Sequence, residues 1–154
     1  MKILASILLG ITLFTLLACH RTESRQQPLL QAKNLMKEHP DSAQILLETI
    51  PSPEKLPIEE YATWCLLVTQ AQNKNYVKCM SDSVINIAVE YFGKIKNPLH
   101  YAKALYYIGR AYGMQKDWQR AIEFYKKGED IALLINDKSA LSLSLSECAT
   151  IYKQ

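Results

Sequence analysis

The length and composition of this chain limit its class before any motif is considered. It has 154 residues, a formal net charge of +3 at pH 7, and only five glycines and six prolines. That length is typical of one domain with a sizeable core. A near-neutral chain without a block of Lys and Arg is not expected to bind nucleic acid. The body is rich in Ala, Leu, Glu, Lys and Gln, which favour helices, so we expect an all-α domain.

Residues 1–18 have the pattern of a secretory signal. Lys2 supplies a positive charge, and the run from Ile3 to Leu17 carries none. A charged start, a short apolar run and small residues before a cleavage point are typical of such signals. The run is shorter than the roughly 20 residues that a transmembrane helix needs.

The end of this segment, Leu16-Leu17-Ala18-Cys19, resembles the lipobox of bacterial lipoproteins. The resemblance implies cleavage before Cys19, diacylglycerol and further acyl chains such as palmitate on that residue, and localisation in the cell envelope. Stable anchoring takes two or more acyl chains, and a lipoprotein cysteine carries up to three. An ordinary cleaved signal and an uncleaved anchor are the alternatives. We therefore expect a signal peptide (1–18), a polar tether (19–27) and a helical domain (28–154).

Hydrophobic spacing predicts about seven helices after the signal. In chain order they are a helical hairpin over residues 28–50, capped internally by Asp41 or Ser42, then helices over about 56–74, 83–96, 99–113, 118–134 and 139–152. Strict alternation from Leu141 to Ser146 by itself favours a strand. Leu141, Leu145, Cys148 and Tyr152 also fit helical spacing, and a lone strand would have no partner, so we expect a helix there.

The remaining cysteines, Cys65, Cys79 and Cys148, do not suggest a disulfide framework, because their number is odd and no CxxC motif occurs. Cys65 and Cys148 fall within helical patterns and are expected to be small buried hydrophobic residues. Cys79 falls in a polar loop.

One stretch, from Ala104 to Ala132, combines two small residues with large ones at fixed spacing. The small residues are Gly109 and Ala121, and the large ones are Ile108, Tyr112, Ile122 and Tyr125. This pattern resembles the tetratricopeptide repeat (TPR). The resemblance implies a right-handed α-solenoid of antiparallel helix pairs, in which Gly109 and Ala121 lie where two helices cross closely and the large side chains fill the space around them. Leu105 and Leu133 depart from the motif, which prefers Trp and Pro there.

The layout as a whole resembles the TPR lipoproteins common in Bacteroidetes. The resemblance includes the segments 39–43, 64–67 and 74–77, and Leu145, Cys148, Ala149 and Tyr152 repeat the first-helix pattern. It implies a membrane-anchored scaffold for protein–protein interaction. The alternative is the extracytoplasmic sensor part of a longer signalling or transcription regulator. The seventh helix would be the first of a helix pair, and it would either lack the second helix or itself act as the terminal cap of the solenoid.

No catalytic or metal-binding motif is evident. His20, His39 and His100 are scattered, and adjacent acids such as Glu59 and Glu60 do not face each other on a helix. We therefore expect no enzyme activity, cofactor, metal or small-molecule substrate.

In TPR proteins the first helix of each pair faces the concave surface. By position, this resemblance puts Lys103, Tyr106 and Arg110 there, together with residues one pair earlier and one pair later: Thr69, Gln72, Ser146, Thr150 and Lys153. A cationic, hydrogen-bonding groove would suit an extended peptide or an acidic chain end. The alternative is that these are ordinary solvated positions.

Overall fold

The computed structural model describes residues 27–77 and 81–153, and this part of the chain is helical without a β-strand. The signal segment, Cys19, most of the expected tether and Cys79 lie outside the described residues. After a helical segment over residues 27–35 come the elements α2 (Pro40–Glu48), η1 (Pro53–Lys55), α3 (Ile58–Lys74), α4 (Ser83–Lys94), α5 (Pro98–Met114), α6 (Trp118–Leu134) and α7 (Lys138–Ile151). The all-α prediction is confirmed, and so is the helix expected at the alternating Leu and Ser residues.

The three turns that join the last four helices share one geometry. Asn97, Asp117 and Asp137 are the N-cap residues of α5, α6 and α7, and each side chain accepts a backbone N–H bond from the first turn of its helix. The residue before each cap has a left-handed backbone, with φ between 54° and 62°. The cap thus satisfies N–H groups that a helix start leaves unpaired, and the chain reverses direction within a few residues.

The cap predicted at Asp41 or Ser42 is not found. α2 begins at Pro40 with His39 as its N-cap and has no side-chain cap bond, so neither Asp41 nor Ser42 caps it. Proline has no N–H to satisfy and suits the first turn of a helix, which explains the earlier start. At α4 the N-cap Asp82 also makes no cap bond. Its carboxylate accepts the Tyr112 hydroxyl instead, at 2.6 Å.

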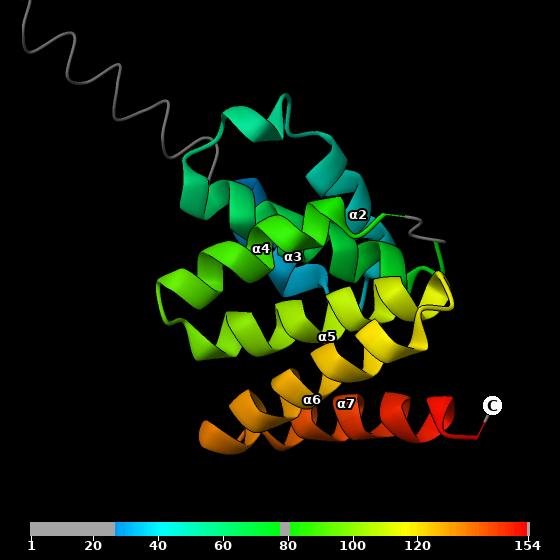
Figure 1. Cartoon of the computed structure of the whole chain (residues 1–154). Helices are drawn as coiled ribbons and strands as arrows, with labels where there is room; N and C mark the ends of the chain where they lie inside the picture. The colour runs from blue at the N-terminus through cyan, green and yellow to red at the C-terminus, as the bar shows by residue number, and fades with distance from the viewer. Residues whose placement is uncertain (1–26, 78–80, 154) are drawn as a thin grey trace, which may run out of the picture.

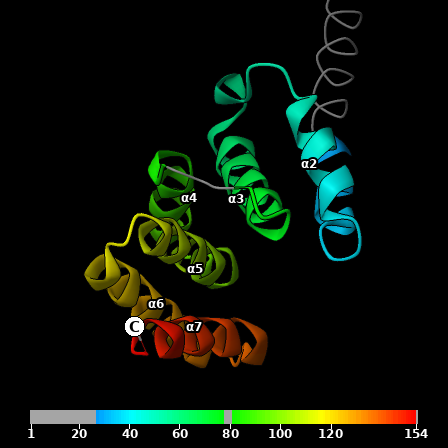
Figure 2. The ribbon, with the colours of Figure 1, turned by 90° about the vertical axis from the view of Figure 1, so that its right-hand side faces the viewer.

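Consecutive helices run in alternating directions and pack on each other (Figure 1). α5 also contacts both α3 and α7, which lie two helices away in the chain. Figure 2 shows the consequence: α3, α5 and α7 follow one side of a curved row, and α4 and α6 lie on the other. One face of the molecule is therefore built from α3, α5 and α7.

α5 and α6 approach each other closely at Gly109. A Cβ atom added at Gly109 would lie 2.6 Å from Cε1 of Tyr125, which is only 1 % exposed. Ile108, Tyr112, Ala121 and Tyr125 are buried in one hydrophobic cluster, whereas Ile122 is half-buried. Most of the small and large residues identified in the sequence thus meet in one core.

The two described cysteines are free and buried, as expected. Burial raises the pKa of Cys65 to about 12 and that of Cys148 to about 11. Both thiols are therefore protonated at neutral pH and behave as apolar core groups.

Candidate functional site: a lysine-lined groove

Two adjoining hollows occupy the face built from α3 and α5. The smaller, of about 290 Å³, lies where the N-terminal helix and the turn after it meet these two helices. The larger, of about 550 Å³, lies between α3, α5 and the start of α7. Both are lined by Lys37, Gln70, Lys74 and Lys103. Because they share these residues, we treat the two hollows as one surface, the groove.

The groove is positively charged. Among the described residues, four lysines line it, Lys33, Lys37, Lys74 and Lys103, against one carboxylate, Asp137. The Lys37 ammonium also lies 3.6 Å from Oε1 of the exposed Glu38. An Oδ1 atom of that carboxylate already accepts the backbone N–H groups of the first turn of α7, at 3.0 Å. Within residues 27–77 and 81–153, no ion pair engages the ammonium groups of Lys74 or Lys103. These two charges are therefore available to a ligand.

The walls between the lysines are apolar and aromatic. Met36, Leu66 and Leu67 line the smaller hollow, and Tyr106, Tyr107 and Leu143 line the larger one. The rings of Tyr106 and Tyr107 meet edge to face, 5.0 Å apart. Burial raises the pKa of both phenols, so their hydroxyl groups are neutral at physiological pH. The groove can therefore contact apolar groups as well as anions.

His100 lines the smaller hollow without adding to its charge. Its ring stacks on Phe92, with 4.9 Å between the ring centroids, and its Nδ1 lies 3.0 Å from Oδ1 of Asn97. Burial, and then the positive charges of Lys33 and Lys103, lower the pKa of the imidazole. The positive potential of this hollow thus comes from the lysines.

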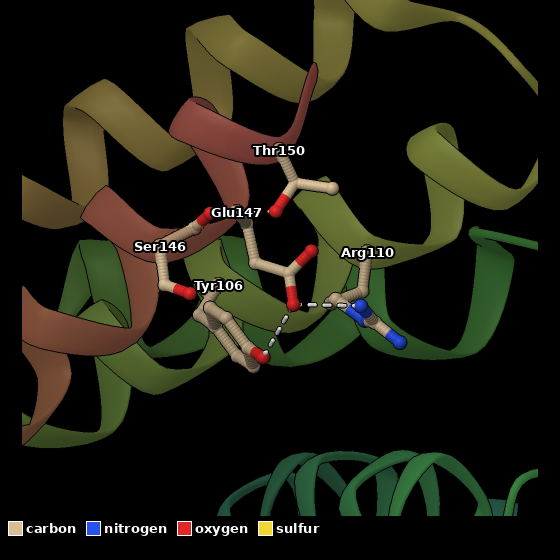
Figure 3. Close-up of polar contacts among 5 residues, drawn as sticks. All are labelled: Tyr106, Arg110, Ser146, Glu147 and Thr150. Carbon is tan, nitrogen blue, oxygen red and sulfur yellow. Dashed lines mark hydrogen bonds and ion pairs between the residues drawn. The ribbon is translucent and has the colours of Figure 1, made fainter. Parts of the chain in front are cut away.

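Arg110 is paired with Glu147 of α7 (Figure 3). Its Nη1 donates to Oε1 of Glu147 at 2.7 Å, and the Tyr106 hydroxyl donates to the same oxygen from 3.5 Å. The side chains of Arg110 and Glu147 are only 33 % and 24 % exposed. This partly buried pair connects α5 to α7, so the positive charge of Arg110 is neutralised within the fold.

The structure brings only part of the predicted site together. Lys103 and Tyr106 line the groove, whereas Arg110 is paired with Glu147 and lines a separate hollow of about 200 Å³. Thr69 is 4 % exposed, and its hydroxyl donates to the carbonyl of Cys65. The other residues expected on this face line neither hollow of the groove: Gln72, Ser146, Thr150 and Lys153.

The sequence analysis missed several groove residues, because each residue on a helix is rotated by about 100° from the one before it. Gln70, directly after Thr69, lines the groove, as does Lys74 one turn later. Lys33 and Lys37 come from the N-terminal region. Their spacing of one helical turn is a signal that could have indicated a shared face.

Comparisons of the chain with protein-family profiles, with curated proteins and with solved structures give no match. In the described part of the chain no helix is long and apolar enough to cross a membrane, and no cluster of His, Cys, Asp and Glu could hold a metal ion.

What the structure defines is an all-helical protein with a cationic, partly apolar groove. That arrangement can bind an anionic ligand that also carries apolar groups.

Proposed function

We propose that this protein is a membrane-anchored, TPR-like scaffold of the cell envelope, which holds a protein partner in the groove. The observation that carries the proposal is the groove itself, where the ammonium groups of Lys74 and Lys103 have no ion-pair partner among the described residues. A charged surface that the fold does not neutralise is available for recognition.

The arrangement of the helices supports the TPR-like part of this proposal. Contacts between the described helices join only neighbours and next neighbours in the chain, which is the pattern of a solenoid. The contact of Gly109 with Tyr125 is of the small-against-large kind that the repeat requires. The contacts of α5 with α3 and α7 correspond to an inner layer of first helices.

The lipid anchor rests on the sequence Leu16-Leu17-Ala18-Cys19 and on the polar residues that follow it. A lipid on Cys19 and a short tether would hold the groove close to a membrane surface, where a partner would be captured. Because one helical fold serves many functions, the proposal depends on the groove and the anchor together.

Two measurements test it. The intact mass of the protein from membranes of its native host is expected to equal residues 19–154 plus acyl chains, and a full-length mass without lipid would contradict the anchor. A photo-crosslinking amino acid in place of Gln70 is expected to capture a partner in those membranes. The matched control carries the crosslinker at Lys126, which is exposed on α6 and lines neither hollow. Equal capture from both positions, or none from position 70, would refute the groove.

A further inference from the structure

We propose that the groove binds an extended acidic segment of a partner protein, in which a run of carboxylates is followed by a large apolar side chain. This inference rests on the proposed function and specifies its ligand. Both hollows are lined by lysines and apolar side chains, but only the smaller one adds Lys33 and only the larger one has the carboxylate of Asp137 and the exposed Leu143. This difference assigns one part of the segment to each.

The smaller hollow is the carboxylate site. It is lined by all four groove lysines, and no acidic residue of ranges 27–77 and 81–153 lines it. Ion pairs in solvent-exposed settings are individually weak. One carboxylate would therefore bind poorly, whereas a run of them, placed against Lys33, Lys37, Lys74 and Lys103 together, gives a useful affinity.

The larger hollow is the apolar site. Tyr107 and Ala140 line it, and Leu143 of α7 lies on it with 47 % of its surface exposed. Its volume of about 550 Å³ is within the roughly 300–1,000 Å³ of typical ligand clefts. An apolar side chain placed here would cover Leu143 and contact the aromatic wall, which removes apolar surface from water.

The single acidic residue fixes the direction of the segment. Asp137 lines only the larger hollow, at the start of α7, so its negative charge makes a carboxylate less favourable there than in the smaller hollow. The carboxylates of the ligand therefore lie towards the N-terminal helix and its apolar residue towards α7. The shared lysines Lys37, Lys74 and Lys103 lie between the two sites.

An anionic membrane surface could also attract lysines. The position of Lys103 argues against it, because this residue is half-buried and lines both hollows together with residues of α3. A flat array of headgroups cannot follow a hollow between helices, whereas a single extended chain can. The geometry therefore favours a peptide segment.

The test uses the full-length protein purified from membranes in detergent and a fluorescein-labelled peptide with a run of glutamates followed by leucines. Fluorescence anisotropy measures its affinity. Replacing the glutamates by glutamines, or the leucines by serines, is expected to weaken binding about tenfold, the equivalent of about 1.4 kcal/mol. Comparable binding of the glutamine peptide would overturn the inference.

Two sets of variants locate the contacts. Lys74→Glu with Lys103→Glu is expected to weaken probe binding about tenfold or more. Lys94→Glu with Lys126→Glu, on α4 and α6, changes the net charge equally and should leave binding within about twofold, since neither residue lines the groove. Leu143→Ser should weaken binding of the leucine peptide but not of the serine peptide. An equal loss in both charge variants, or no difference between the two peptides with Leu143→Ser, would refute the assignment.

The remaining outcomes distinguish this inference from the proposed function. If position 70 captures a partner but the probe does not bind, the scaffold stands and the ligand chemistry is wrong. If neither occurs, both are wrong. If vesicles containing phosphatidylglycerol bind as tightly as the peptide and depend on Lys74 and Lys103 in the same way, the groove is a membrane contact and the peptide inference is refuted.

Discussion

A single methyl group at Gly109 should test the close contact between α5 and α6. In Gly109→Ala the added Cβ would lie 2.6 Å and 2.8 Å from two ring carbons of Tyr125. Carbon atoms pack best at about 3.5–4.0 Å, so the ring would have to move by roughly 1 Å. Tyr125 is almost fully buried, and its ring contacts that of Tyr106 with 5.9 Å between centroids. The ring therefore has little room to move.

Two effects of opposite sign determine the change in the free energy of unfolding. Overpacking a core costs about 1–3 kcal/mol, whereas replacing Gly by Ala inside a helix gains up to about 1 kcal/mol. Gly113 is the matched control on the same helix, because its added Cβ would meet nothing closer than 3.9 Å. Gly113→Ala should thus keep the gain without the clash. We expect Gly109→Ala to be less stable than Gly113→Ala by about 1–3 kcal/mol.

Urea unfolding followed by circular dichroism measures this difference, and thermal unfolding should show it as a gap of roughly 3 °C or more in Tm. Gly109→Leu should be less stable still. The double variant Gly109→Ala with Tyr125→Leu tests the cause, because removing the ring should make the combined loss smaller than the sum of the two single losses. The reasoning is refuted if Gly109→Ala is as stable as Gly113→Ala.

Three further predictions concern the caps, the phenols and the thiols. Asp137→Ala removes the side-chain cap of α7 and should lower the free energy of unfolding by about 1 kcal/mol, whereas an unchanged urea midpoint would show that the cap adds nothing. Burial raises the pKa of Tyr107 and Tyr125 above 10 in the folded protein, so these phenols ionise first in the unfolded chain and stability should fall as pH rises beyond about 10. The urea midpoint measured across that range checks this, and Tyr107→Phe should reduce the fall. Alkylation followed by peptide mass mapping should label Cys65 and Cys148 only after denaturation, because both are buried, and rapid labelling of the native protein would contradict the burial.

Much of the fold could be predicted because each helix carries its own signals. The spacing of apolar residues places α6 at the residues expected, Trp118 to Leu134. The turns between the last helices also follow a sequence pattern. Asn97, Asp117 and Asp137 recur at a constant interval, each just before a helix. A recurring Asn or Asp at one helix-plus-turn spacing is a cap signal with a physical cause.

The groove was harder to predict, because it depends on how each helix is rotated and on contacts between distant residues. The sequence predicted Thr69 for the concave face, but Thr69 lies in the core while Gln70 lines the groove. Arg110 was predicted for the same face, and nothing local indicates that it pairs with Glu147, 37 residues later. Burial and pairing of this kind follow from the packing of whole helices.

These differences show how α7 shapes the groove. Its Glu147 pairs with Arg110 and removes that cation from the binding surface. Its N-cap Asp137 places the one carboxylate of the groove in the larger hollow, and Leu143 adds apolar surface beside it. Lys37, Lys74 and Lys103 line both hollows, and Lys37 also lies 3.6 Å from Oε1 of Glu38. The smaller hollow adds Lys33 and lacks Asp137 among its described lining residues, so it is the more positive of the two. A ligand with uniform charge would meet only half of this surface favourably, whereas a ligand that changes from acidic to apolar along its length would match both halves.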